Sequence, residues 1–114
     1  NYYPNGAASV SKHADDEPQL VAGAPIFSYT FLATGSATDG AREFEIWRNP
    51  KAIDVAGKGK VASVLLGHGD LLVMCGQMQT DFLHSVPKCD SNVGRINLTV
   101  RKFTAAPIKK RKRK

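Results

Sequence analysis

The stretch "RINLTVRKF", residues 95–103, alternates polar and apolar side chains from Arg95 to Arg101. Because side chains two residues apart point to the same face of a strand, this alternation predicts a strand over Arg95–Phe103, with Arg95, Asn97 and Arg101 on one face. Alternation alone favours a half-buried strand whose polar face lies in water. Arginine forks also suit bidentate binding of carboxylates, so the same face would need an anion if it lined the interior of a barrel.

Upstream of this strand, short runs of β-favouring residues are separated by turn segments rich in Gly, Asn and Asp, such as "TGSATDG" and "CDSNVG". No segment shows the periodicity of a long helix. Strand-turn-strand units at this density predict an all-β domain of the sandwich or jelly-roll type. Its other predicted strands are Ala8–Lys12, Ile26–Leu32, Arg42–Arg48, Val61–Leu66, Leu71–Cys75 and Phe82–Val86.

The length of 114 residues suits a single domain, which we assign to residues 1–103, followed by a tail over residues 104–114. The chain opens with Asn1 instead of Met, so we interpret it as a piece of a longer protein. It shows neither a signal peptide nor an apolar run of membrane length, and we expect no membrane partner. Cys75 and Cys89 have neither metal-ribbon spacing nor a disulfide pattern, which predicts reduced thiols in an intracellular protein.

The net charge of +6 arises at the end of the chain. The run "KKRKRK", Lys109–Lys114, holds six of the sixteen Lys and Arg residues, and the ten that remain balance the ten Asp and Glu residues. A continuous run of cations repels itself and cannot pack, so we expect this basic tail to be disordered. It is typical of a nuclear-localisation signal, which predicts a nuclear protein and otherwise a cytoplasmic one, or of an arm that binds phosphates. A solubilising end without a partner is the alternative.

A histidine precedes three consecutive acids in "KHADDEPQL", residues 12–20. In an extended chain His13 and Asp15 point to the same side, where they can bind one metal ion unless the acids merely occupy a solvated turn. For the third ligand we favour His84, in a predicted strand with apolar neighbours, over His68, which lies between glycines at a predicted hairpin tip. Two histidines and one carboxylate leave metal positions open, as in non-haem Fe(II) oxygenases.

With the arginine strand added, the order His13-x-Asp15, His84, Arg95 resembles the AlkB family of Fe(II)/2-oxoglutarate dioxygenases. "NYYPNGAASVSKHADDEPQL" is similar to the family's opening strand and iron motif, and "GHGDLLVMCGQMQTDFLHSVPK" to the strand pair with the distal histidine. The likeness covers most of residues 1–103 and is greatest to the eukaryotic DNA-repair and RNA-demethylating branches. It implies a double-stranded β-helix (jelly roll) as the catalytic core.

The resemblance also implies a role for each matching residue. His13, Asp15 and His84 would ligate Fe(II). Arg95 would form a salt bridge with the distal carboxylate of the co-substrate 2-oxoglutarate, and Arg101 would bind near its metal-side end. Further contacts to 2-oxoglutarate would come from Asn1 and Tyr3, with Asn97 as a minor one.

Past the carboxylate ligand, the resemblance places Asp16 and Glu17 facing the target base; acids on a turn are the alternative. The implied reaction is oxidative demethylation of N-alkylated bases, 1-methyladenine and 3-methylcytosine, with O2 consumed and formaldehyde and succinate released. These lesions are cationic, so a nearby carboxylate favours them, and the base must be flipped out of the stack. The implied partner is alkylated DNA or RNA, with no obligate protein partner.

Two features depart from the family pattern. The segment "LATGSATDGARE" is longer than the usual link, and the nucleotide-recognition lid that the family keeps upstream would be missing from this fragment. Two alternatives therefore stay open for the function. One is an Fe(II)/2-oxoglutarate hydroxylase or demethylase acting on protein or a small molecule, and the other is a non-catalytic β-sandwich that binds nucleic acid through its basic tail.

Overall fold

The computed structural model describes residues 1–52 and 59–104, and within these ranges the chain forms strands and turns without a helix. Accordingly, no described element is a helix that could span a membrane. The strands are β1 (Tyr2–Tyr3), β2 (Val10–His13), β3 (Ile26–Leu32), β4 (Arg42–Arg48), β5 (Lys60–Leu66), β6 (Leu71–Met74), β7 (Phe82–Val86) and β8 (Arg95–Val100).

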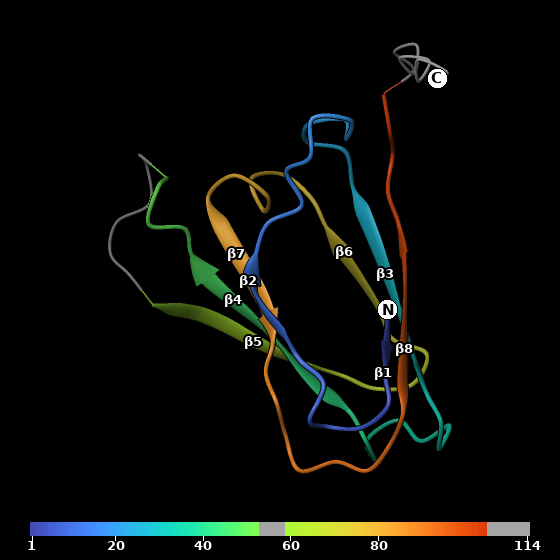
Figure 1. Ribbon diagram of the computed structural model, residues 1–114. Coiled ribbons are helices and arrows are strands. Elements are labelled where there is room, and N and C mark those ends of the chain that lie inside the picture. The colour runs from blue at the N-terminus through green and yellow to red at the C-terminus, as the bar shows by residue number, and fades with distance from the viewer. Residues whose placement is uncertain (53–58, 105–114) are drawn as a thin grey trace, which may run out of the picture.

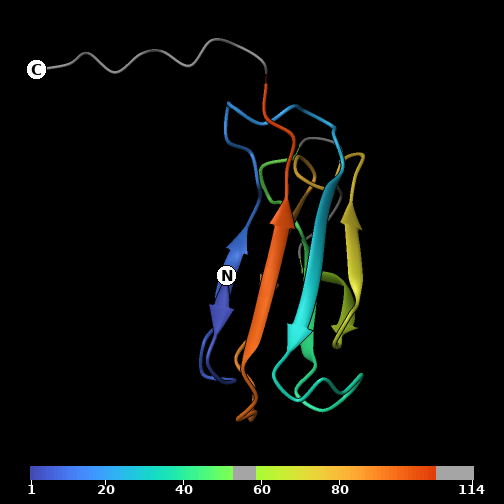
Figure 2. The same ribbon diagram turned by 90° about the vertical axis from the view of Figure 1, so that its right-hand side faces the viewer.

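The eight strands form two four-stranded sheets that face each other (Figure 1). One sheet has the order β1-β8-β3-β6 and the other the order β2-β7-β4-β5, so strands distant in sequence become neighbours. Every pairing between named strands is antiparallel. Seen from the side, β1, β8, β3 and β6 stand next to one another as one layer (Figure 2). The predicted all-β jelly roll is confirmed.

The polar face of β8 points into the space between the sheets. Arg95 is 2% exposed and Asn97 is 8% exposed, whereas Ile96 and Leu98, which alternate with them, are 52% and 54% exposed. The polar face of β8 therefore lines the interior, and the alternative prediction that it faces water is wrong. The interior also contains an apolar cluster made of Tyr3, Ile26, Phe44, Leu66, Met74 and Val86.

The ends of several strands differ from the prediction. β2 begins at Val10 and includes His13, because His13 pairs with His84 across the sheet. β8 ends at Val100, and the chain beyond it is held at one point by an isolated bridge between Phe103 and Leu20. Strand alternation does not reveal where backbone pairing stops. Smaller differences are the extension of β5 to Lys60 and the end of β6 at Met74.

Three other predictions have different outcomes. Alternation did not predict β1 because it has only two residues, although the family resemblance implied an opening strand; it pairs with Arg95 and Ile96 of β8. Cys75 and Cys89 are exposed and free, without a disulfide between them. The run Lys109–Lys114 lies outside the described residues, so the disordered tail and the domain boundary stay predictions.

Candidate metal centre and the cavity beside it

Strand pairing brings the predicted metal ligands together. His13, at the end of β2, stands opposite His84 of β7, and their ring centroids are 4.2 Å apart. Asp15 follows two residues beyond β2. One ligand atom from each of His13, Asp15 and His84 lies within 4.8 Å of the others, which is a group able to hold a metal ion.

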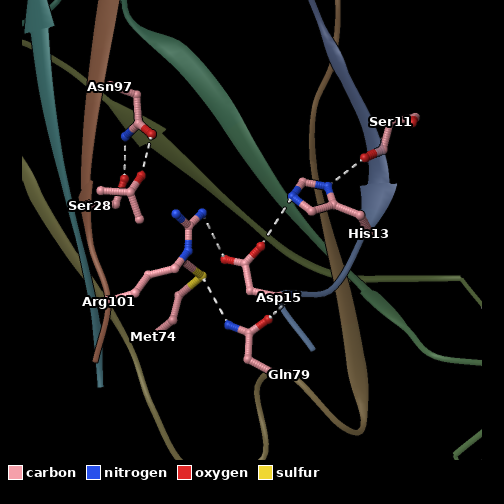
Figure 3. Close-up of polar contacts among 9 residues, drawn as sticks. Ser11, His13, Asp15, Ser28, Met74, Gln79, Asn97 and Arg101 are labelled. Atoms are coloured by element: carbon pink, nitrogen blue, oxygen red, sulfur yellow. Dashed lines mark hydrogen bonds and ion pairs between the residues drawn. The ribbon is translucent and has the colours of Figure 1, made fainter. Parts of the chain in front are cut away.

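The Asp15 carboxylate lies between a histidine and an arginine (Figure 3). Its Oδ1 is 3.8 Å from Nε2 of His13, and its Oδ2 is 3.4 Å from a guanidinium nitrogen of Arg101. The Asp15 side chain is only 10% exposed. A shielded carboxylate beside two imidazoles supplies the anionic charge that a divalent cation needs in such a site.

The hydrogen bonding of His13 and the pKa of His84 both suit metal binding. Nδ1 of His13 is 2.8 Å from the carbonyl oxygen of Ser11, which can only accept, so Nδ1 is the donor in this bond and Nε2, on the side of Asp15, is the nitrogen available to a metal. Burial, and then the nearby charge of His13, lower the pKa of His84 to about 4. His84 is therefore neutral at physiological pH, the form in which imidazole binds metals.

A cavity with an empty volume of about 430 Å³ begins at this cluster and continues between the sheets. Its lining includes the three clustered residues and most of the polar face of β8. It therefore joins a possible metal position to the arginine strand in one space. The predicted site residues that line it are Asn1, Tyr3, His13, Asp15, His84, Arg95, Asn97 and Arg101.

Arg95 is a buried cation without a carboxylate partner in the described part of the chain. One guanidinium nitrogen donates to Oγ1 of Thr30 at 3.1 Å, while Nε and Nη1 are buried without a hydrogen-bond partner among the described residues. Burial lowers the pKa of Arg95 below its ordinary value. Tyr3 partly opposes this shift, and the nearby charge of Arg42 adds to it. Leaving a charge so poorly satisfied is costly, so this end of the cavity is suited to a carboxylate ligand.

Asn97, in contrast, is already occupied by protein contacts. Its amide nitrogen donates to the Ser28 hydroxyl and, at 3.3 Å, to the carbonyl of Tyr29, and its oxygen accepts from Thr99 at 2.8 Å. Its backbone N–H donates to the carbonyl of Asn1 at 2.8 Å, which places Asn1 on the cavity wall. A minor role in ligand binding, as the resemblance implied, is all that these contacts leave for Asn97.

Asp16 and Glu17 are exposed and lie outside the first cavity. They line a second cavity, with an empty volume of about 760 Å³, together with Gln79 and Lys102. Asp15 and Met74 line both cavities, so the two spaces adjoin next to the candidate metal centre.

His68 is not part of the cluster, and it has a structural contact that the sequence did not indicate. Its exposed ring accepts a hydrogen bond at Nδ1 from the backbone N–H of Leu32, at 2.9 Å. This hydrogen bond connects the turn before β6 to Leu32, the last residue of β3.

Besides Arg95, a second arginine is buried, Arg42, and sequence reasoning did not single it out. It is 1% exposed and donates to three backbone carbonyls, at 2.7 Å to Ala8 and to Pro87 and at 3.3 Å to Asn5. These bonds tie the chain before His13 to the chain after His84. A signal was present, because the alternation in "REFEIWR" places Arg42 on the same face as the buried Phe44.

Comparison with known proteins places this geometry in a family. A model of the 2OG-Fe(II) oxygenase superfamily matches residues 1–101. The alpha-ketoglutarate-dependent dioxygenase alkB homolog 3 of Bos taurus is 41% identical over 104 residues, which are 89% of this chain and 34% of that protein. The Homo sapiens DNA oxidative demethylase ALKBH2 is 34% identical over 106 residues, 90% of this chain and 38% of that protein. This chain thus spans about a third of the length of these relatives.

The description of the matching family names Fe(II) and 2-oxoglutarate, which confirms the predicted metal and co-substrate. The residues fit both groups, since the cavity has a His-Asp-His cluster and a buried guanidinium that has no carboxylate partner among the described residues. The chain therefore belongs to the 2OG-Fe(II) oxygenase superfamily and, as its sequence predicted, is AlkB-like.

Proposed function

We propose that this protein is an Fe(II)- and 2-oxoglutarate-dependent dioxygenase that removes methyl groups from alkylated bases of DNA or RNA. The observation that carries this proposal is one cavity lined by both the His-Asp-His cluster and Arg95, whose guanidinium has no carboxylate partner in the part of the chain that the structure describes. The names of the relatives point the same way, since one is a DNA oxidative demethylase.

In this proposal His13, Asp15 and His84 hold Fe(II). The two histidines are fixed by the pairing of β2 with β7, and His84, whose pKa burial lowers to about 4, presents a neutral imidazole at physiological pH. Fe(II) and 2-oxoglutarate, when bound, would supply oxidative chemistry: one atom of O2 enters succinate as 2-oxoglutarate loses carbon dioxide, and the other hydroxylates the N-methyl group, whose C–N bond then breaks to release formaldehyde and the unmethylated base. The protein holds the reacting groups in place and keeps water from them.

The co-substrate roles follow from the cavity wall. Arg95 binds the distal carboxylate of 2-oxoglutarate, because its Nε and Nη1 are buried donors without a partner among the described residues. Tyr3 lies beside it, with its ring centroid 5.0 Å from the Arg95 guanidinium carbon. Arg101, which contacts Asp15, binds near the metal-side end. Asn1 and Tyr3 contribute further contacts to 2-oxoglutarate from the same wall, and Asn97 contributes a minor one.

The second cavity is the proposed place for the target base. 1-Methyladenine and 3-methylcytosine carry a positive charge, and Asp16 and Glu17 line this cavity next to Asp15. Carboxylates there attract a cationic base more than an unmodified neutral one. A base reaches such a cavity only when flipped out of the stack, which costs least in a single strand.

The assay that tests this proposal measures succinate and formaldehyde from the Fe(II)-loaded protein, with and without an oligonucleotide containing 1-methyladenine or 3-methylcytosine. We expect the methylated oligonucleotide to stimulate succinate release and to yield formaldehyde in equal amount, while its unmethylated counterpart does neither. Stimulation by a methylated peptide alone would identify a protein substrate instead. Absence of succinate under every condition would contradict a dioxygenase.

For the basic tail we propose a phosphate-binding role, and we also propose that it serves as a nuclear-localisation signal. Deleting Lys109–Lys114 is expected to weaken binding to long nucleic acid and to flatten its salt dependence, because each lost phosphate contact removes roughly one unit of the log–log slope. Turnover of a methylated mononucleotide should barely change. Titrations at several salt concentrations check this, and an equal loss on short and long substrates would show that the tail supports the fold or the site.

A further inference from the structure

Asp15 lies where strand pairing has ended. β2 stops at His13, whose backbone pairs with His84, and Asp15 is two residues further along in irregular chain. The backbone N–H of Asp15 nevertheless has a partner, because it donates to the side-chain oxygen Oε1 of Gln79 at 2.8 Å. Figure 3 shows Gln79 directly beside Asp15, with the other end of its amide toward Met74. A side chain thus takes the place of a neighbouring strand.

The orientation of the Gln79 amide is determined by its two partners. The N–H of Asp15 can only donate, so it requires the amide oxygen, and the amide nitrogen is left to donate to Sδ of Met74 at 3.6 Å. Gln79 itself lies in a turn before β7 that is held by its own hydrogen bonds. In this turn the backbone N–H groups of Thr80 and Asp81 both donate to the carbonyl of Gln77, at 3.1 and 2.9 Å.

The contacts of the Asp15 carboxylate are longer than this backbone bond. They are 3.8 Å to His13 and 3.4 Å to Arg101, beyond the 2.7–2.9 Å or so of a strong charge-assisted hydrogen bond. The short bond to Gln79 is therefore the contact that sets where the Asp15 backbone, and with it the carboxylate, stands relative to the two histidines. Sites of this kind require a geometry held to within about 0.5 Å.

We propose that Gln79 is a positioning residue, which places the carboxylate of Asp15 for metal binding by accepting a hydrogen bond from the Asp15 backbone. This inference rests on the proposed function in one respect, the assignment of Asp15 as a metal ligand. It assigns to the turn before β7 a part in the metal centre that is independent of His84. It also explains why an amide that lines the second cavity is turned with its oxygen toward the metal-binding segment.

The test uses Co(II), which binds nitrogen and oxygen sites more tightly than Fe(II) and is followed by its visible absorption. Gln79→Leu removes the acceptor at similar size and is expected to weaken Co(II) binding by about tenfold, the lower end of the usual effect of such supporting residues. Gln79→Glu keeps an oxygen acceptor at the same position and is expected to retain the affinity. Gln77→Leu, in the same turn, is the matched control and should bind Co(II) like the unsubstituted protein.

Each result decides one question. Unchanged Co(II) affinity in Gln79→Leu would overturn the positioning role, because the hydrogen bond would then have no effect on metal binding. Equal losses of Co(II) affinity in Gln79→Leu and Gln79→Glu would also overturn it, because the loss would then not depend on the oxygen acceptor. If circular dichroism shows that Gln79→Leu is misfolded, Gln79→Asn takes its place, because its amide is one methylene too short to reach Asp15 and the same loss is expected. Asp15→Ala is measured in parallel: retained Co(II) binding there would contradict the metal site itself and not the part played by Gln79.

Discussion

Replacing Asp15 by Ala is expected to abolish the turnover of 2-oxoglutarate and to remove most of the affinity for Fe(II). Asp15 is the only anionic member of the His-Asp-His cluster, and its carboxylate is 10% exposed. Without it, two imidazoles and no anionic ligand remain to bind a divalent cation, and the charged group of Arg101 that contacts Asp15 is left beside the metal position. The measurements are succinate release and Fe(II) binding under anaerobic conditions.

His68→Ala is the control for this experiment, because it removes a histidine that lies outside the cluster. The substitution deprives the N–H of Leu32 of its acceptor, which is expected to cost about 1 kcal/mol of stability while leaving Fe(II) binding intact. His84→Ala should in turn lower the Fe(II) affinity. If His68→Ala abolishes Fe(II) binding and His84→Ala does not, the third ligand has been assigned to the wrong histidine.

Much of the metal centre could be predicted from the sequence because its ligands lie in or next to strands with clear patterns. The bounds of β3, β4 and β7 agree with the predicted ranges, and β7 carries His84 to its place opposite His13. Local alternation is sufficient for such strands, since each is long enough to show it. Two residues of β1 are too few for a pattern, and only the family resemblance indicated that strand.

The contacts that alternation could not predict are those that depend on the other sheet or on a turn. Alternation shows that β8 has two unlike faces, but the burial of its polar face requires a cavity whose opposite wall comes from β2, β4 and β7. Gln79 and Asp15 are 64 positions apart, and their hydrogen bond depends on how the turn before β7 is placed. Arg42 is similar, since its three acceptors lie in two other segments of the chain.

The buried face of β8 makes Arg95→Lys the most direct test of the co-substrate site. Lysine keeps the positive charge but loses the planar fork that binds a carboxylate through two parallel bonds. A buried hydrogen bond to a charged group is worth roughly 1.5–3 kcal/mol, and about 1.4 kcal/mol corresponds to a tenfold change in affinity. The apparent affinity for 2-oxoglutarate is therefore expected to fall by roughly tenfold to a hundredfold.

The same substitution should leave Fe(II) affinity measured without 2-oxoglutarate almost unchanged, because Arg95 is not one of the clustered ligands. Arg48→Lys on β4 is the matched control, since Arg48 is half-buried and lines neither of the two cavities. In a well-folded Arg95→Lys protein, an unaltered dependence of succinate release on 2-oxoglutarate would remove Arg95 from the co-substrate site. A joint loss of Fe(II) and 2-oxoglutarate affinity would instead show that Arg95 supports the fold of the cavity. A guanidinium that only binds the carboxylate of 2-oxoglutarate should not change Fe(II) binding measured without 2-oxoglutarate.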